Sequence, residues 1–172
     1  MDDLRLSIIQ REDRIIRSLD AKLSPRYDGE TAKVRAMNTR IIEITRRNER
    51  MFEFAKRMAE LSSYGKFRHG AVLVKHGVVL NASHNKDKPC SFGSRFRCRS
   101  KGQATLHAEL GAILNMPRES TEGSDVYVVR INYDNQFRNS KPCPMCQEAM
   151  RFCGIKRVFY STQEGHFEMM KL

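Results

Sequence analysis

The chain has 172 residues, which is enough for one domain of ordinary size with an extension and too few for two full domains. Hydrophobic residues make up 40% of it, so it can bury a core, but no apolar run approaches the roughly 18 residues that a membrane-spanning helix needs. We therefore expect no membrane partner. The net charge of +11 favours electrostatic steering and solubility and does not by itself identify a partner.

The first 47 residues are predicted to form a helical extension to a domain that covers residues 48–172. Apolar residues fall near helical spacing through the first 23 residues, and a second stripe with the same period runs from about Thr31 to Ser63. Asn48 is the expected N-cap that divides the extension from the domain. The N-terminus carries acids first and charges throughout, unlike a secretory signal, so we expect a cytoplasmic location.

Within the domain the hydrophobic period changes from that of a helix to that of strands. Residues 71–75 and 78–82 are predicted strands, joined at His76 and Gly77 in a tight hairpin. The elements expected next are a polar loop over 84–103, helices over 105–116 and 142–153, and strands over 126–131 and 157–160. The strand, helix, strand order predicts a right-handed parallel crossover. Residues 161–165 are then a predicted turn, and residues 167–171 a short antiparallel strand.

Three metal-ligating side chains stand where the two later helices begin. Cys143 and Cys146 are three residues apart, so on a helix they point to the same side, and Pro142 and Pro144 favour a helix that starts there. His107 lies in the first turn of the other helix and supplies a neutral imidazole. Catalytic zinc takes three such ligands and keeps a fourth position for a water, whose pKa it lowers to about 7. The sequence therefore predicts a Zn²⁺ site at His107, Cys143 and Cys146.

Glu109, two residues after His107, is the predicted catalytic residue. Its carboxylate need not bind the metal, and it can move protons from the water to the substrate and its leaving amine. His-x-Glu alone is a weak signal, because a second copy stands at His166 and Glu168, but Pro-Cys-x-x-Cys is rare by chance. A structural zinc clip or a coincidental thiol pair is the alternative, although a purely structural site has no need of Glu109.

In these motifs the stretch from Phe52 to Tyr160 resembles the cytidine and deoxycytidylate deaminase superfamily. Residues 107–113 (HAELGAI) are similar to deoxycytidylate deaminases, whereas residues 142–146 (PCPMC) also resemble guanine deaminases and tRNA adenosine deaminases. The resemblance implies an α/β fold, a three-layer α/β/α sandwich with a mixed sheet. The strand at 167–171, in a place where deoxycytidylate and tRNA deaminases have a helix, makes the predicted topology closer to the free-nucleoside branch.

The resemblance also implies residues that contact the substrate. Asn85 matches the asparagine that contacts the sugar, and Ala71 lies where the backbone approaches the base. Ala108 and Pro142, inside the two motifs, are the other substrate contacts expected from the family pattern.

A basic loop precedes the His107 helix and is a candidate phosphate-binding segment. Its expected phosphate contacts are Lys86, Lys88, Arg95, Arg97 and Arg99, and Phe92 and Phe96 between them suit stacking on bases. The alternative is a solvated loop whose phenylalanines pack onto the core. Cys90 and Cys98, with a histidine such as His84 or His69, are a candidate second zinc site, but their spacing fits no recognised ligand pattern and favours ordinary thiols.

These observations favour a zinc-dependent hydrolytic deaminase that converts a cytosine nucleoside or nucleotide, with deoxycytidylate or cytidylate preferred, into its uracil form. One alternative is a base deaminase that acts on single-stranded DNA or RNA, for which the net charge would form the groove. A guanine or adenine deaminase and a non-catalytic zinc protein are the others. Because deaminases of this resemblance commonly assemble, we also expect a homo-oligomer in which residues 1–47 pair subunits. The alternatives are that this extension packs on its own domain or binds an acidic partner.

Overall fold

The computed structural model describes residues 39–41, 45–64, 67–97, 102–163 and 165–172. These residues belong to one compact unit that spans Ala36–Leu172. The predicted helices of residues 1–38 lie outside the described residues. Among the helices that are described, none is long and apolar enough to cross a membrane.

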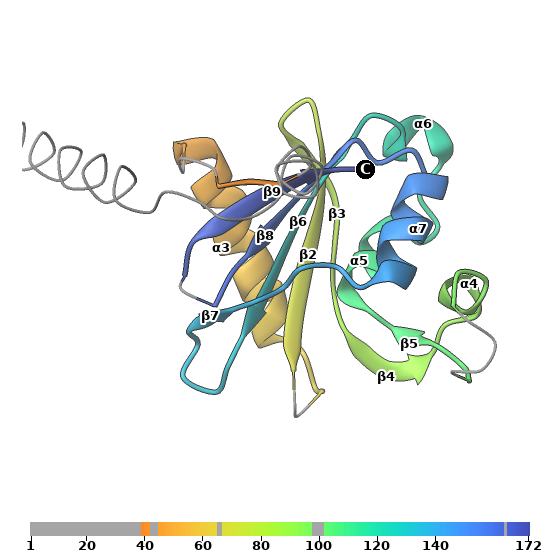
Figure 1. Cartoon of the computed structure of the whole chain (residues 1–172), viewed down its shortest axis with the longest axis horizontal. Helices are drawn as coiled ribbons and strands as arrows, with labels where there is room; N and C mark the ends of the chain where they lie inside the picture. Colours follow the sequence, from red (N-terminus) through yellow and green to blue (C-terminus); the bar gives the residue numbers. More distant parts are fainter. Residues whose placement is uncertain (1–38, 42–44, 65–66, 98–101, 164) are drawn as a thin grey trace, which may run out of the picture. The chain divides into compact units, whose positions relative to one another are not determined.

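A mixed sheet forms the centre of the unit (Figure 1). Its path runs β1 (Thr39–Ile41), β9 (Phe167–Lys171), β8 (Arg157–Ser161), β6 (Asp125–Ile131), β2 (Arg68–Lys75) and β3 (Val78–His84). The pair β6 and β8 is parallel, and every other neighbouring pair on this path is antiparallel. A short strand, β7 (Phe137–Arg138), pairs with the end of β6. The parallel crossover and the antiparallel C-terminal strand predicted from the sequence are both confirmed.

Helices cover both faces of the sheet, which gives the expected three layers (Figure 1). On one face α3 (Arg46–Glu60) buries Phe52, Ala55 and Ala59 against alternate residues of β2 and β6. On the other face lie α5 (Ala108–Ile113) and α7 (Pro144–Phe152), which pack on the intervening residues of the same strands. Successive strand residues point to opposite faces, so β2 and β6 serve both cores. A short helix, α6 (Arg118–Thr121), precedes β6.

The hairpin between β2 and β3 turns at His76 and Gly77, as predicted. Both residues have positive φ, 49° and 85°, which is the backbone pattern of a tight two-residue hairpin turn. This turn fixes the pairing of β2 with β3 and so the direction in which each β2 side chain points.

The helical stretch predicted to begin near Thr31 is wrong at residues 39–41, and the N-cap predicted at Asn48 is wrong as well. Thr39–Ile41 form β1, which pairs with β9 at the edge of the sheet, so these residues belong to the domain and not to the extension. The helix that follows starts later, and its N-cap is Thr45, whose side chain accepts from the backbone N of Asn48. Asn48 itself accepts a hydrogen bond from the hydroxyl of Tyr127 at 2.8 Å instead of capping the helix.

The segment predicted as a polar loop contains two elements. β4 (Lys86–Pro89) pairs with β5 (Thr105–Leu106) in a small second sheet, and α4 (Ser91–Ser94) lies between them in sequence. Because residues 105 and 106 form β5, the helix predicted over 105–116 begins at Ala108, with His107 as its N-cap. This short sheet places His107 at the start of α5.

Candidate metal centre and active site

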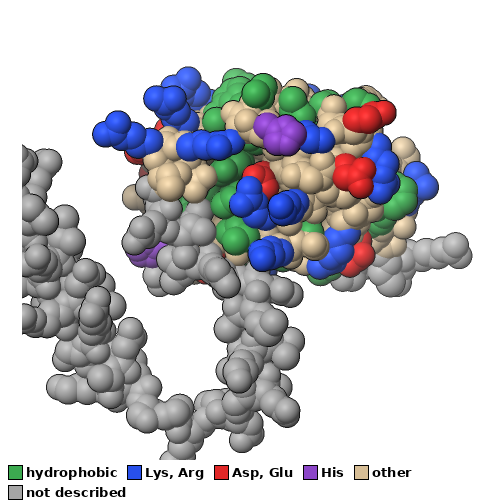
Figure 2. Space-filling model, turned by 90° about the horizontal axis from the view of Figure 1, so that it is seen from above, with side chains coloured by type: hydrophobic (Ala, Val, Ile, Leu, Met, Phe, Trp, Pro, Cys, Tyr) green, Lys and Arg blue, Asp and Glu red, His purple; other side chains and the backbone are tan. Residues whose placement is uncertain are grey.

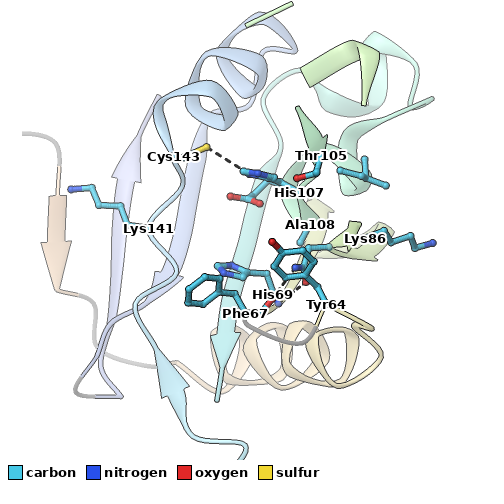
Figure 3. Close-up of a pocket in the computed structure, with 12 residues that line it drawn as sticks. Tyr64, Phe67, His69, Lys86, Thr105, His107, Ala108, Lys141 and Cys143 are labelled. Carbon is cyan, nitrogen blue, oxygen red and sulfur yellow. Dashed lines mark hydrogen bonds between the residues drawn. The ribbon is translucent and has the colours of Figure 1, made fainter. Parts of the chain in front are cut away.

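His107 and Cys143 are the N-cap residues of α5 and α7, and Cys146 lies in the first turn of α7. Pro144 stands at the first position of α7. Proline has no backbone N–H, and at this position an N–H would have no partner within the helix, so proline favours a helix that begins here. The Nδ1 atom of His107 lies 3.3 Å from the Cys146 sulfur and 3.6 Å from the Cys143 sulfur. Figure 3 shows the contact between His107 and Cys143. The two helix starts therefore bring the three predicted ligands together.

The spacing of these three side chains fits one tetrahedral zinc ion. With Zn–S near 2.3 Å and Zn–N near 2.05 Å, two ligands of one ion lie about 3.6 Å apart. The observed nitrogen-to-sulfur distances are 3.3 and 3.6 Å, and all three ligand atoms lie within 4.8 Å of one another. Within the described part of the chain this is the one histidine, cysteine and carboxylate group with metal-binding spacing.

The electrostatics of the cluster also suit a cation. Hydrogen bonds from the Cys146 thiol and from His107 lower the pKa of Cys143 to about 4, so it carries a thiolate. The same hydrogen bond and burial raise the pKa of Cys146, and the bond to Cys143 raises that of His107. A bound metal ion takes the place of these shared protons.

Glu109 lies on α5 with only 4% of its surface exposed. Burial raises the pKa of its carboxyl, and the nearby His107 acts in the opposite direction. A carboxyl in such a place exchanges protons near neutral pH more readily than an exposed one. Glu109 lies outside the group of three ligands, as the sequence predicts.

A cavity of about 230 Å³ opens beside the metal ligands (Figure 3). It is lined by Tyr64, Phe67, His69, Asn85, Lys86, Thr105, Leu106, His107, Ala108, Glu109, Lys141 and Cys143. The cavity thus has two of the three predicted metal ligands and a buried carboxyl in its wall, with room for one small molecule.

The zinc-binding region of cytidine and deoxycytidylate deaminases, as a family model, matches residues 45–162 of this chain. The chain belongs to this deaminase family. A tRNA-specific adenosine deaminase of Agrobacterium fabrum is 32% identical over 100 residues, which are 55% of this chain and 51% of that protein. The chain therefore spans about half the length of this curated relative.

Comparison with solved structures also finds deaminases, one of which supports the fold at a TM-score of 0.50. A dCMP deaminase of cyanophage S-TIM5, in complex with dCMP and dUMP, aligns over 70% of this chain and 85% of its own, with 22% identity and a TM-score of 0.50. A cytidine deaminase of Burkholderia pseudomallei aligns over 74% and 93%, with 21% identity and a TM-score of 0.49.

Of the four substrate contacts implied by the deaminase pattern, the structure brings two to the cavity. Asn85 and Ala108 line it, whereas Ala71 is fully buried in the core between β2 and α5. Pro142 is buried as well, and its carbonyl accepts a hydrogen bond from the side chain of Gln147 at 2.7 Å. Ala71 and Pro142 are therefore not among the residues that line the cavity.

Asn85 holds the segment that forms one wall of the deaminase cavity. Its Oδ1 accepts hydrogen bonds from the hydroxyl of Ser62 at 2.7 Å and from the backbone N of His69 at 2.8 Å. Its Nδ2 donates to the carbonyl of Phe67 at 2.8 Å. The side chain thus fixes both ends of the segment from Ser62 to His69, which carries Tyr64 and Phe67 into the wall.

The basic loop contributes one lysine to the wall of the cavity. Lys86 lines it, and Lys88 is exposed on β4. Arg95 lies over the ring of Phe152, and Arg97 donates to the carbonyl of Gln103 at 2.8 Å. Arg99 lies outside the described residues. On the end of the molecule drawn in Figure 2, basic side chains are also spread over the surface with acidic ones among them, so charge alone does not mark the site.

The phenylalanines of this loop pack inward. Phe92 and Phe96 are in contact, with ring centroids 5.3 Å apart, and both pack against the core beside α5 and α7. The interpretation of these rings as core residues therefore fits better than base stacking. Cys90 is buried and accepts from the backbone N of Gly93, while Cys98 lies outside the described residues, so the second zinc site stays a prediction.

His69 is the cavity residue that sequence reasoning most clearly missed. Burial and the neighbouring Arg130 lower its pKa to about 4, so the imidazole is neutral at pH 7. The alternation of β2 contained the signal, because residue 69 points to the same face as residues 71 and 73, the face that α5 covers. Lys141, directly before the Pro-Cys-x-x-Cys motif, is a second missed lining residue.

Proposed function

We propose that this protein is a zinc-dependent hydrolytic deaminase that removes the amino group from a cytosine nucleotide or nucleoside, with deoxycytidylate or cytidylate preferred. The observation that carries the proposal is the buried Glu109 carboxyl in the wall of a cavity beside His107, Cys143 and Cys146. A site built only for structural zinc gains nothing from a buried acid next to an open cavity, because burying it costs free energy.

The chain's residues have separate tasks in this reaction. His107, Cys143 and Cys146 would hold Zn²⁺, which would supply Lewis-acid activation of the attacking water. Glu109 accepts a proton from that water at a carboxylate oxygen and delivers it to the ring nitrogen. A second proton, from the hydroxyl now on the ring carbon, then passes through Glu109 to the amine. A carbon–oxygen bond forms at the carbon that bears the amine, the carbon–nitrogen bond breaks, and ammonia leaves. The wall of Tyr64, Phe67 and Ala108 surrounds the base and excludes bulk water.

The size and charge of the cavity support a single nucleotide as the substrate. Its volume of about 230 Å³ is at the small end for ligand pockets, which suits one pyrimidine base and its sugar. Lys86 and Lys141 lie on opposite sides of it (Figure 3), where a phosphate outside the cavity meets positive charge. The neutral His69 offers the sugar or the base a hydrogen-bond donor and an acceptor.

A base deaminase that acts on a nucleic-acid strand is the second candidate. Similarity to a tRNA-specific adenosine deaminase and the net charge of +11 support it. Binding of a strand should weaken steeply with salt, because each phosphate contact releases counterions. Turnover of free nucleotide that is insensitive to salt favours the first candidate, and turnover of the strand alone favours the second.

A homo-oligomer is a further part of the proposal, with the N-terminal extension pairing subunits. Light scattering on the full chain and on a version without residues 1–35 tests it. Loss of the oligomer on truncation supports the role of the extension, and an unchanged oligomer removes it.

Substitution of Glu109 by Gln tests the central role of this carboxyl. Gln keeps the size of the side chain but cannot take a proton, so we expect turnover to fall by about 10² to 10⁴. Bound zinc, measured by metal analysis, should stay at one ion per chain. Glu119→Gln, at an exposed position on α6, is the matched control and should keep full turnover. Retained activity in Glu109→Gln would contradict the proposed mechanism.

A further inference from the structure

Three basic side chains form a row across neighbouring strands beside the cavity. In the sheet, Arg130 of β6 lies directly opposite His69 of β2 on one side and Arg138 of β7 on the other. Residues opposite one another in antiparallel strands point to the same face, so all three lie on the face that α5 and α7 cover. His69 is neutral at pH 7, but Arg130 and Arg138 are like charges directly opposite each other, which is destabilising to the folded protein by itself.

Among the described residues, no carboxylate forms an ion pair with either arginine of this row. Arg138 donates to the carbonyl of Phe137 and to the amide oxygen of Gln136, which are neutral acceptors. The guanidinium of Arg130 lies over the ring of Phe67, 4.2 Å from its centroid. Burial lowers the pKa of Arg130, and the charge of the neighbouring Arg138 lowers it further. The row is therefore a local concentration of positive charge without a protein counterion.

The row starts in the cavity and continues outward from it. His69 and Phe67 line the cavity, and Arg130 contacts Phe67 from outside. Lys141 lines the same side of the cavity, away from Lys86 (Figure 3). A group attached to a molecule in the cavity and projecting on this side thus meets Arg130, then Arg138.

The backbone that carries Arg138 is held firmly. Its carbonyl accepts a hydrogen bond from the hydroxyl of Ser161 at 2.7 Å. Two residues later Ser140, which is buried, donates to the carbonyl of Val128 at 2.8 Å and bonds with Ser161. Because β7 is tied to β6 and β8 in this way, binding through Arg138 requires little additional ordering of the chain.

We propose that Arg130 and Arg138 bind the phosphate group of the nucleotide whose base enters the cavity, with Lys141 as a third positive charge. This inference rests on the proposed function for the identity of the base. A guanidinium presents paired N–H donors that match two phosphate oxygens. Arg138 keeps donors that its two neutral acceptors do not use, and Arg130 lies over the ring of Phe67. The phosphate then supplies the counterion that the row lacks.

Product binding tests this site without depending on turnover. Isothermal titration compares dUMP with deoxyuridine, which differ only by the phosphate, on the zinc-loaded protein. We expect the wild type to bind dUMP about 10 to 100 times more tightly than deoxyuridine. In Arg138→Gln the preference for dUMP over deoxyuridine should fall about tenfold. In the double variant Arg130→Gln, Arg138→Gln nearly all of this preference should be lost. The affinity for deoxyuridine should stay unchanged in both variants. Arg130→Lys and Arg138→Lys should recover part of it.

A matched control removes the same charge elsewhere. The double variant Arg118→Gln, Arg151→Gln lowers the net charge equally, at exposed ion pairs on α6 and α7, and should keep the preference for dUMP. The proposal would be overturned if the control variant lost as much of the dUMP preference as the Arg130 and Arg138 variants do. It would also be overturned if those variants lost affinity for dUMP and deoxyuridine to the same extent. If the double variant does not fold, Arg138→Gln alone decides by the same comparison.

Further comparisons show whether the phosphate belongs to a free nucleotide or to a strand. They also show whether the phosphate site and the proposed function fail independently. A short cytosine-bearing strand is tested as well. If the Arg130 and Arg138 variants bind this strand more weakly than the wild type does, and the wild type binds dUMP no more tightly than deoxyuridine, the phosphate belongs to a strand. If the wild type turns over cytosine substrates but shows no phosphate preference in any arm, the site fails and the proposed function stands. If a phosphate preference depends on the two arginines but no cytosine substrate turns over, the site stands and the cytosine assignment fails.

Discussion

Replacing Asn85 by Ala should have two effects at once: the fold becomes less stable, and one wall of the cavity is no longer held in place. The side chain makes three hydrogen bonds, with Ser62, His69 and Phe67, at 2.7 to 2.8 Å. Each contributes about 1 kcal/mol net, and partial exposure of the site allows water to replace some of them. We therefore expect a loss of about 2 to 3 kcal/mol in the free energy of unfolding.

Urea unfolding of the zinc-loaded protein measures this loss. With a slope near 2 kcal/mol per molar, the midpoint should fall by roughly 1 M. Asn85→Asp keeps an oxygen that accepts from Ser62 and His69 but loses the donor to the carbonyl of Phe67. Its free energy of unfolding should therefore fall by less than that of Asn85→Ala. Since Phe67 forms the wall, the affinity for nucleotide should fall in both variants.

Asn81 on β3, the strand that ends just before Asn85, provides the control. Its side chain bonds with Ala82 and with the carbonyl of Ala112, away from the residues that line the cavity. Asn81→Ala should lose comparable stability while nucleotide affinity stays unchanged. If Asn85→Ala leaves the urea midpoint where it is, or if Asn81→Ala weakens nucleotide binding as strongly, the assignment of Asn85 as the residue that holds this wall is wrong.

Three further predictions follow from other parts of the structure. The pKa of His69 falls from 6.5 to about 4 on folding, which corresponds to roughly 3 kcal/mol, so its protonation favours the unfolded chain. Stability should accordingly fall as the pH drops from 6.5 to 4, and by less in His69→Gln; unfolding curves that change identically with pH in both proteins would refute this. Gly70→Ala should cost about 1 to 3 kcal/mol or more, because a Cβ there would lie 2.0 Å from the carbonyl oxygen of Ala55, and a melting temperature equal to wild type would contradict that contact. Removal of zinc by a chelator should lower the melting temperature and expose the thiols of Cys143 and Cys146 to a thiol reagent, and readdition of zinc should reverse both.

The metal ligands could be predicted from the sequence because their positions depend on local rules. The spacing of Cys143 and Cys146 places both on one side of a helix start, and Pro144 marks where that helix begins. His107 stands at the start of the other helix for a similar reason. Only the meeting of the two helix starts required tertiary structure, and the family resemblance supplied it.

The row of His69, Arg130 and Arg138 could not be predicted in this way. It depends on the register of β6 against β7 and against β2, and a long stretch of sequence separates β2 from the other two strands. Register is set by turns and by the buried faces of the strands, and a shift of one residue would point Arg130 to the other face. The role of Asn85 has the same origin, because its partners lie 16 to 23 residues away.

The error at β1 shows how tertiary pairing overrides local pattern. Residues 37 to 44 have apolar side chains at helical spacing, which favoured a helix there. In the structure Thr39–Ile41 complete the edge of the sheet beside β9. The hydrogen bonds offered by an unpaired edge strand outweigh the weak local preference of three residues.

The most direct test of the account is release of ammonia from the purified, zinc-loaded chain. Deoxycytidine, cytidine, their monophosphates and triphosphates, guanine and a cytosine-bearing single strand are offered in parallel, and each product is identified. We predict turnover of a free cytosine nucleotide to its uracil form, with a monophosphate preferred over its nucleoside and with no turnover in Glu109→Gln. Absence of ammonia release from every substrate, with zinc bound at His107, Cys143 and Cys146, would contradict the proposal that this cavity is a cytosine deaminase site.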